Sequence, residues 1–320
     1  MTENVNETEM QDLVYSLAAS PNFGQDRVCF AARQSGLYCS DDGGASWRAA
    51  YDSLNLAAPL TTLAVIVSPN FESDGIVFAG VPGGIMRSID GGTSWSAAFL
   101  PSPPPVVSTL AVSPHFESDG IVFAGTVEDG VFCSTDRGGR WVPWNFGLLD
   151  LSVFCMAISP DFGNDETIFV GTESGVFRST NGGRAWREVD FPLEFAPVLS
   201  LVVSPDYSND GDGGVLFAGT ESCGLFRSQD KGRTWTRLGQ DAVDDAVNGI
   251  VISPEFPAKP DILVVLGTTL LVSRDGGQSW ANWKAGQAFE QGLASAAAPQ
   301  GLDGDAVLLV GLVEGGVLRV

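Results

Sequence analysis

An eight-residue motif, Ser-x-Asp-x-Gly-x-x-Trp, recurs six times through the 320-residue chain and constrains its fold more than any other feature. Successive Trp residues of the motif are 48, 46, 45, 49 and 45 positions apart, so the copies keep an almost constant phase. A fixed period of this length indicates a repeat architecture. The third and last positions of the six copies are occupied by Asp42 and Trp47, Asp90 and Trp95, Asp136 and Trp141, Asn181 and Trp186, Asp230 and Trp235, and Asp275 and Trp280.

A second marker, a Ser-Pro dipeptide, precedes each of these Trp residues by about 27 positions. Its first copy is Ser20-Pro21 and its sixth is Ser253-Pro254. A seventh, altered copy follows at Ala298-Pro299, and the chain ends where the seventh Asp motif would begin. The sequence therefore contains seven units.

Each unit contains four short apolar runs of strand length, bounded by turn residues; the fourth unit reads SVFCMAIS, TIFVGT, GVFRS and AWREV. No segment has a sustained helical period. Four strands in about 46 residues, repeated seven times, predict an all-β fold, a seven-bladed β-propeller of four-stranded antiparallel blades. We expect one domain over residues 13–320, with blades at about 13–50, 60–98, 106–144, 152–190, 197–238, 246–283 and 291–320.

The seventh unit lacks a fourth strand of its own. The polar segment 1–12 either supplies that strand and so covers an exposed edge, or forms a loose tail beside a last blade of three strands.

The Asp motif lies between the third and fourth runs, where a short carboxylate can accept backbone N–H groups across a hairpin and the Trp can pack on the blade. The pattern resembles the Asp-box (BNR) repeat of β-propellers, a family that includes sialidases, sortilin-type receptors and photosystem assembly factors. The resemblance covers about residues 13–320 and implies a structural role for the box residues. It does not specify a function.

The sequence contains few residues that could form a catalytic site. The first run of each unit, which lines the channel of a propeller, contains no Asp, Glu, Lys, Arg or His, and His115 is the only histidine. A sialidase needs an arginine cluster and a catalytic triad needs a histidine near its nucleophile. Two loop carboxylates would still suffice for another type of glycosidase. We therefore predict a non-catalytic protein and keep a glycosidase as the alternative.

One Ser-Pro loop is longer and acidic. The ligand-like residues Asp206, Ser208, Asp210 and Asp212 match the start of a calcium-binding loop, but Phe217 stands where the bidentate Glu would be. The segment is read either as a weak calcium site or as an Asp- and Gly-rich turn. No other cofactor is predicted.

The net charge is −22, from 17 Lys and Arg against 39 Asp and Glu. This excess disfavours nucleic acid and favours a basic protein as partner. No apolar run is long enough to cross a membrane, so no membrane insertion is expected. No secretion signal is visible and the five cysteines include no CxxC pair, which predicts a cytoplasmic protein.

The loops that link blades and the second-to-third-strand loops emerge on one face of a propeller. They combine acids with aromatic residues, including Tyr51, Phe99, Phe146 and Phe195. We predict that the protein is a scaffold whose partner binds this face, and that the binding residues are Glu128, Asp129, Glu173, Glu221, Asp244, Asp245, Trp144 and Trp283. The alternatives are a carbohydrate-binding or glycoside-hydrolase-like propeller, in which the two Trp residues stack on sugar rings, and an assembly factor for a larger complex.

Overall fold

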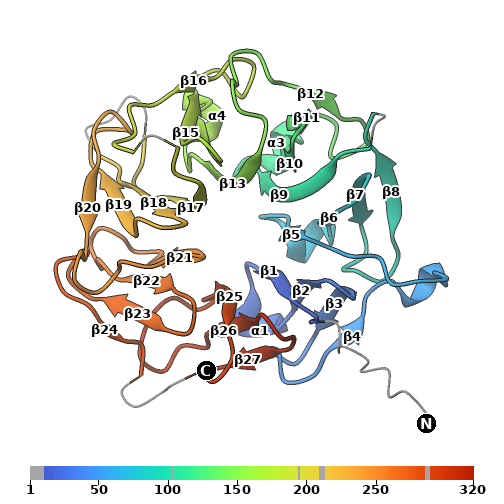
Figure 1. Cartoon of the computed structure of the whole chain (residues 1–320). Helices are drawn as coiled ribbons and strands as arrows, with labels where there is room; N and C mark the ends of the chain where they lie inside the picture. Colours follow the sequence, from blue (N-terminus) through green and yellow to red (C-terminus); the bar gives the residue numbers. More distant parts are fainter. Residues whose placement is uncertain (1–10, 102–103, 194, 209–212, 285–288) are drawn as a thin grey trace, which may run out of the picture.

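Seven β-sheets surround a central axis in the computed structural model, which describes residues 11–101, 104–193, 195–208, 213–284 and 289–320 (Figure 1). Six sheets have four strands and the last has three, all paired in chain order. Neighbouring strands within every blade are antiparallel. The predicted seven-bladed propeller is thereby confirmed.

The innermost strand of each blade faces the central axis, and the second and third strands follow outward. The innermost strands are β1 (Val14–Ala19), β5 (Ala64–Val67), β9 (Val106–Val112), β13 (Val153–Ile158), β17 (Val198–Val203), β21 (Gly249–Ile252) and β25 (Leu293–Ala297). The second strands are β2 (Cys29–Arg33), β6 (Val77–Val81), β10 (Val122–Val127), β14 (Ile168–Thr172), β18 (Leu216–Thr220), β22 (Ile262–Val265) and β26 (Leu309–Leu312).

The third strands carry the Ser of each Asp motif near their ends, and the outermost strands follow the motif. The third strands are β3 (Gly36–Ser40), β7 (Gly84–Ser88), β11 (Gly130–Ser134), β15 (Val176–Ser179), β19 (Leu225–Ser228), β23 (Leu270–Ser273) and β27 (Val317–Arg319). The outermost strands are β4 (Arg48–Ala49), β8 (Ser96–Phe99), β12 (Val142–Pro143), β16 (Arg187–Glu188), β20 (Thr236–Leu238) and β24 (Ala281–Asn282).

Short helical turns follow the first four Ser-Pro markers, where the sequence had indicated only loops. They are α1 (Phe23–Asp26), α2 (Phe71–Asp74), α3 (Phe116–Asp119) and α4 (Phe162–Asp165), and a 3₁₀ turn, η1 (Asp52–Leu54), lies in the first linking loop. The turn in blade two shows the design: Ser68 Oγ donates to Asp74 Oδ2 at 2.6 Å, and Asp74 Oδ1 accepts the Ile76 N–H at 2.9 Å. Four residues are too few to produce a helical period in a sequence.

The Asp-motif turn is held by its own carboxylate. In blade two, Asp90 Oδ1 accepts the Ser94 N–H at 2.9 Å, and Asp90 Oδ2 accepts the Ser94 hydroxyl. Gly92 has a φ of +85°, in the left-handed region that favours glycine, and a Cβ there would lie 2.8 Å from the Phe30 ring of the preceding blade. Trp95 is buried. The turn therefore joins its own hairpin and packs on its neighbour.

A valine at or just before the start of an inner strand packs against a glycine of the preceding blade at most seams. A Cβ on Gly219 would lie 2.6 Å from Val247 Cγ1, because the two blades approach too closely for any side chain. The same close approach joins Gly80 to Val107, Gly125 to Val153, Gly171 to Val198 and Gly311 to Val14. These close approaches show that the blade seams are tightly packed.

Side chains in or just before the inner strands donate hydrogen bonds across the seams. The Ser200 hydroxyl donates to the Val247 carbonyl at 3.0 Å, and the Asn248 amide donates to the Leu293 carbonyl at 3.0 Å. Equivalent bonds run from Ser108 to Val153, from Cys155 to Val198 and from Ser295 to Val14. On the outer side, Arg227 Nη1 donates to the Gly276 carbonyl of the next box turn at 3.1 Å.

The ring closes by packing of β1 against β25, without a shared sheet between the first and last blades. In the described residues, β27 is the outermost strand of blade seven. The predicted closing strand falls within 1–12, of which residues 1–10 lie outside the described part of the chain. Asp12 is described: its carboxylate accepts the Ser35 N–H at 2.8 Å and lies 3.8 Å from the Arg33 guanidinium.

Candidate protein-binding face

Two kinds of loop share one end of the propeller because successive strands run in opposite directions. The turns between second and third strands and the loops that link blades form this end, which we call the loop face. The Ser-Pro turns and the Asp-motif turns form the opposite end, which we call the box face. The assignment follows from the strand order and the antiparallel pairing of every blade.

The predicted acids lie on the loop face and are almost all exposed. Glu128, Glu173 and Glu221 occupy the turns after β10, β14 and β18, and they are exposed to solvent. Asp244 and Asp245 are exposed in the loop that links blades five and six, and Asp129 is half-buried. The acids are therefore distributed around the face, at the tips of blades three to six.

Cations are scarce on the same loops. Arg33, at the end of β2, is close to the Asp12 carboxylate, and its side chain is only 11% exposed. Lys284 is a second cation near this face, and Arg237 of β20 is a third, since a Cβ on Gly224 in the turn after β18 would lie 3.5 Å from Arg237 Nη2. By contrast, Arg137, Arg140, Arg184, Lys231 and Arg233 all belong to box turns. The loop face is thus more uniformly negative than the box face, and it would attract a cationic partner.

Asp150 fixes one of the linking loops. Its carboxylate accepts the Ser152 N–H at 3.0 Å and the Ser174 N–H at 2.7 Å, and so joins the loop after blade three to the turn of blade four. Burial raises the pKa of Asp150, but the hydrogen bonds from Ser152, Ser174 and Thr172 outweigh it and hold the pKa below its ordinary value. The carboxylate is ionised at neutral pH and contributes to the negative charge of the face.

The two predicted tryptophans pack within the blades. Trp283 is 8% exposed and belongs to the core between blades six and seven. Trp144 is half-buried, with its ring 6.3 Å from the Phe123 ring and the Arg184 guanidinium 5.6 Å from its centre. Trp283 in particular has no free ring face to stack on a ligand.

The exposed apolar side chains near this face are different ones. Phe195 is 85% exposed and Leu149 81% exposed in linking loops, and Phe99 is 85% exposed at the end of β8. Val127 is 39% exposed beside Glu128. The sequence prediction noted Phe99 and Phe195 among the loop aromatics but did not select them as binding residues. Their exposure depends on backbone direction, which composition alone does not indicate.

The central channel opens on the loop face as a small apolar hollow of about 280 Å³. Its lining comes from the starts of inner strands and includes Tyr15, Leu199, Asn248 and Ala294. No Asp, Glu, His, Lys or Arg lines it among the described residues, so the hollow can accept an apolar side chain.

The predicted calcium loop is only partly described. Asp206 Oδ1 accepts the Ser204 hydroxyl at 2.5 Å, and the Ser208 hydroxyl donates to Asp161 Oδ2 at 3.3 Å. Asp210 and Asp212 lie outside the described residues. Within the described ranges, no group of three or more His, Cys, Asp or Glu side chains has a metal-binding arrangement. The calcium hypothesis stays a prediction.

The fold and this face define a seven-bladed β-propeller with an acidic loop face that carries exposed apolar side chains. No helix among the described residues has both the length and the apolar character needed to span a membrane. No protein-family model matches the chain, and no curated protein matches it in sequence.

Solved structures of propellers are similar in fold. A GH74 xyloglucanase from Xanthomonas campestris is 18% identical with a TM-score of 0.72; the match covers 96% of this chain but only 51% of that one, so this chain spans about half the enzyme's length. YCF48 bound to D1 peptide is 16% identical with a TM-score of 0.68, and 97% and 91% of the two chains are covered. YCF48 from Cyanidioschyzon merolae is 13% identical with a TM-score of 0.66, and 97% and 95% are covered.

Proposed function

We propose that this propeller is a non-catalytic scaffold that binds a basic segment of a partner protein on its loop face. The observation that carries the proposal is the composition of that face: exposed acids at the tips of blades three to six, with few cations near them. Complementary charge of this kind guides a partner to one face and sets its orientation.

Exposed apolar side chains give the same face contact area. Val127 adjoins Glu128, and Phe195 lies in the loop that precedes blade five, whose turn carries Glu221. A partner segment in which Lys or Arg alternates with apolar residues would pair with the acids and bury these side chains. Aromatic and apolar anchors supply most of the binding energy in such interfaces, while rim charges supply specificity and rate.

The likeness to YCF48 supports a peptide-binding role. That propeller has been solved with D1 peptide, and the similarity extends over nearly the full length of both chains. At 16% identity the likeness concerns the fold, so the partner of this chain is proposed by its chemistry. An assembly-factor role for a larger complex is one form that such binding would take.

The test is a comparison of two charge-reversal variants. The tagged protein is used to purify partners from its own host lysate, and the partner recovered in stoichiometric amount is then titrated against purified protein. The loop-face variant is Glu173→Lys, Glu221→Lys and Asp245→Lys. The control variant, Asp41→Lys, Glu72→Lys and Asp305→Lys, changes the net charge equally with exposed acids of the box face.

We expect the loop-face variant to weaken binding at least ten-fold, while the control variant binds within about two-fold of the wild type; a ten-fold change corresponds to about 1.4 kcal/mol. Equal weakening in both variants would mean that only net charge matters. Unchanged binding in the loop-face variant would exclude this face.

The carbohydrate alternative is supported by the GH74 fold likeness alone, and that enzyme is about twice as long as this chain. Since Trp283 is buried, a sugar would have to use other rings. The alternative stays a prediction, to be tested by a glycan array and a polysaccharide hydrolysis screen. A cytoplasmic location likewise stays part of the proposal, and fractionation of the host would test it.

A further inference from the structure

The outermost strand of blade two, β8, is an open sheet edge on the rim of the ring (Figure 1). It has four residues, Ser96–Phe99, whereas the outermost strands of the other blades have two or three among the described residues. Phe99 is strongly exposed, and Ala97 is exposed as well. A sheet edge of this length presents backbone groups with which a further strand can pair.

The backbone groups of Ala97 and Phe99 point away from their own blade. The Leu100 N–H donates to the Gly83 carbonyl at 3.2 Å, which makes these two residues a hydrogen-bonded pair at the end of the β7–β8 ladder. Bonded pairs alternate along an antiparallel ladder, so Ala98 bonds to β7 and its two neighbours do not. No hydrogen bond from another described residue reaches the backbone of Ala97 or Phe99. Their N–H and C=O groups are therefore open to a partner.

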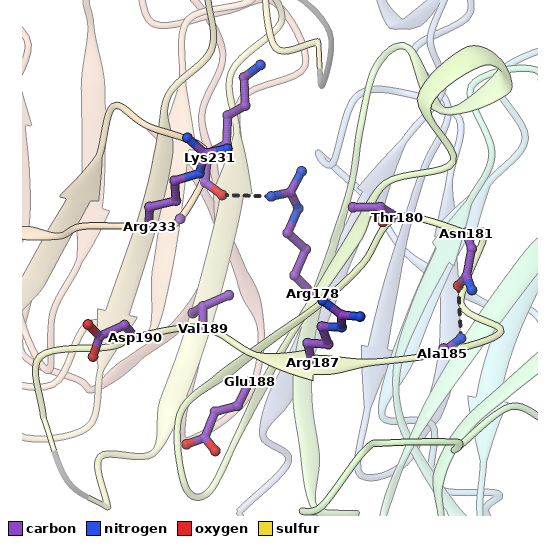
Figure 2. A pocket seen from close by; sticks show the side chains of 11 residues that line it. Arg178, Thr180, Asn181, Ala185, Arg187, Glu188, Val189, Asp190, Lys231 and Arg233 are labelled. Atoms are coloured by element: carbon purple, nitrogen blue, oxygen red, sulfur yellow. Dashed lines mark hydrogen bonds between the residues drawn. The ribbon is translucent and has the colours of Figure 1, made fainter.

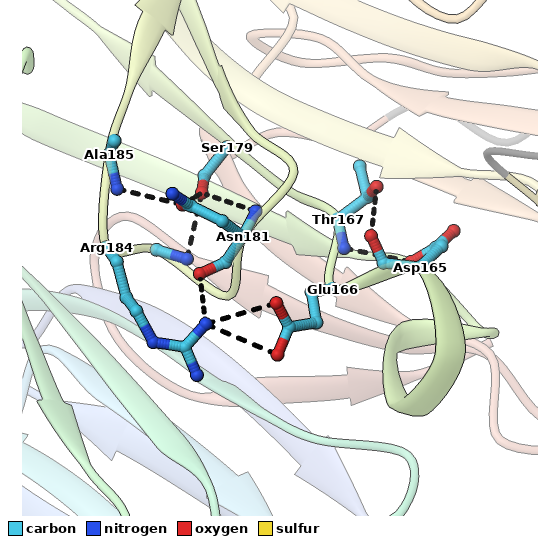
Figure 3. Close-up of polar contacts among 8 residues, drawn as sticks. Asp165, Glu166, Thr167, Ser179, Asn181, Arg184 and Ala185 are labelled. Atoms are coloured by element: carbon cyan, nitrogen blue, oxygen red, sulfur yellow. Dashed lines mark hydrogen bonds and ion pairs between the residues drawn. The ribbon is translucent and has the colours of Figure 1, made fainter.

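The outermost strands begin at the same point after each box turn. In blade four, Asn181 Oδ1 accepts the Ala185 N–H at 2.9 Å (Figure 3), as Asp90 Oδ1 accepts the Ser94 N–H at 2.9 Å in blade two. The second residue after the box Trp therefore has the position of Ala97 in every blade that carries a box. These residues are Ala49, Ala97, Pro143, Glu188, Arg237 and Asn282.

The other outermost strands that follow a box are short, and most carry residues that hinder pairing. β12 contains Pro143, which has no N–H to donate, and β16 contains Arg187 and Glu188 (Figure 2). β4 and β20 carry Arg48 and Arg237. β24 has no charge and no proline, but it is only two residues long. Charged residues and proline protect a sheet edge from pairing with another edge, and β8 has neither.

An apolar hollow of about 350 Å³ opens beside β8. It is lined by Val81, Met86 and Trp95 of blade two and by Leu56 and Leu60 of the loop that links blades one and two. A cavity of about 150 Å³ holds benzene in another protein, so this hollow has room for a phenyl ring.

The surroundings of the hollow carry no charge. The segments 53–71 and 91–116 contain no Asp, Glu, Lys or Arg, in a chain with a net charge of −22, and no such residue lines the hollow. Two copies of so acidic a chain repel each other wherever their charged surfaces meet, so an uncharged sector is where the chain can contact itself. A surface for a basic partner would carry acids instead.

We propose that two copies of this chain pair through β8 about a two-fold axis. In an antiparallel pair centred on Ala98, Phe99 lies opposite Ala97 of the second copy, and the open N–H and C=O groups of both residues bond across the edge. Ala97 and Phe99 share one face of the strand, and both line the hollow. The Phe99 ring therefore packs over the small Ala97 of the second copy and enters its hollow. The loop-face acids lie on blades three to six, so this pairing does not depend on the proposed partner binding.

Sedimentation velocity of the purified full chain over a wide range of protein concentration tests the proposal. The informative variant is Ala97→Pro, which removes the open N–H, and Pro143 shows that a blade folds with proline at this position. Its matched control is Ala49→Pro, the same change at the same position of blade one. A second variant, Phe99→Glu, places a charge in the contact. Its control is Phe146→Glu, at a strongly exposed residue of the loop after blade three.

We expect the wild type to sediment as a dimer at high concentration and as a monomer on dilution. Ala97→Pro and Phe99→Glu should weaken the dimer at least ten-fold, whereas both controls should match the wild type. Added salt should strengthen the dimer, because it screens the repulsion between the two acidic chains. A wild type that stays monomeric would overturn the proposal and leave the edge to a strand of another protein. A dimer that neither Ala97→Pro nor Phe99→Glu weakens, or that the controls weaken equally, would place the contact elsewhere and overturn it as well.

Discussion

The Ser295 hydroxyl donates a hydrogen bond to the Val14 carbonyl at 3.0 Å, although the two residues are 281 positions apart. This bond repeats at the seam of blades seven and one the contact that Ser200 makes with Val247 at the seam of blades five and six. The ring is thus closed by the same chemistry that joins its internal blades.

Removal of this bond tests whether the ring is closed in solution. Ser295→Ala should lower the free energy of unfolding by about 1 kcal/mol, the usual contribution of a partly buried hydrogen bond, as measured by urea denaturation. Ser200→Ala is the matched control and should cost about the same. A cost near zero for Ser295→Ala alone would indicate that the terminal seam is open.

The contact between Gly219 and Val247 predicts a larger effect. In Gly219→Ala the new Cβ would lie 2.6 Å from Val247 Cγ1 and 2.4 Å from Ser200 Oγ, so the seam must widen. We expect a loss of about 1–3 kcal/mol in the free energy of unfolding, measured by urea denaturation. Gly304→Ala is the control, since no atom lies within 4 Å of its added Cβ, and it should be neutral. Equal stability of the two variants would contradict the close packing of the seam.

The box carboxylates predict the response to acid. Hydroxyl and backbone hydrogen bonds from Ser94 lower the pKa of Asp90 to about 2, and those from Ser279 lower the pKa of Asp275 to about 2. In the unfolded chain the pKa of these carboxyl groups is about 4. Between about pH 4 and pH 2 the unfolded state therefore binds more protons than the folded state. The stability they contribute is present above about pH 4 and is lost as the pH falls toward about 2.

The test compares the thermal midpoints of the wild type and of an Asp90→Asn, Asp275→Asn variant from pH 6 to pH 2. Asn181 shows that the box turn accepts Asn. The variant should lose less stability than the wild type over the acid range, because two of its low-pKa groups are absent. Relief of charge repulsion on acidification acts on both proteins alike. Parallel pH profiles would refute the role given to these carboxylates.

Asp150 predicts a local effect on the loop face. Asp150→Ala leaves the Ser174 N–H without its acceptor, so the loop after blade three should loosen. We expect faster hydrogen exchange at the Ser174 amide and a loss of about 1 kcal/mol in the free energy of unfolding. Asp129→Ala is the control, because no hydrogen bond to the Asp129 carboxylate is found in the structure's described part. Unchanged exchange at Ser174 would show that the loop is fixed by other contacts.

The repeat was sufficient to predict the architecture, since the six Asp motifs and seven Ser-Pro markers identify the hairpins and the linking loops. The same signal did not reveal the direction of individual side chains. Trp144 and Trp283 stand next to loops in the sequence, yet Trp283 turns into the core between blades. Whether such a side chain is buried depends on how neighbouring repeats pack together. The sequence pattern of a single repeat carries no information about that packing.

The gathering of four cations at the seam of blades four and five was missed for a related reason. Arg178, Arg187, Lys231 and Arg233 are spread over 56 positions and belong to different repeats. Only the ring geometry brings them together. One departure is visible in the sequence: Asn181 and Ala185 together differ from the Asp and the hydroxyl residue that four of the other boxes carry.

The seam of blades seven and one differs from all others in one respect: no linking loop crosses it within residues 11–320 as far as they are described. Six seams are held by packing and by the covalent chain, and this one is held by packing and by hydrogen bonds such as that from Ser295 to Val14. The contact between β1 and β25 can therefore separate without any linking loop being stretched. The ring can in this sense open at a single joint, and an oxidised cysteine pair engineered across it would convert the propeller into a closed loop of fixed diameter.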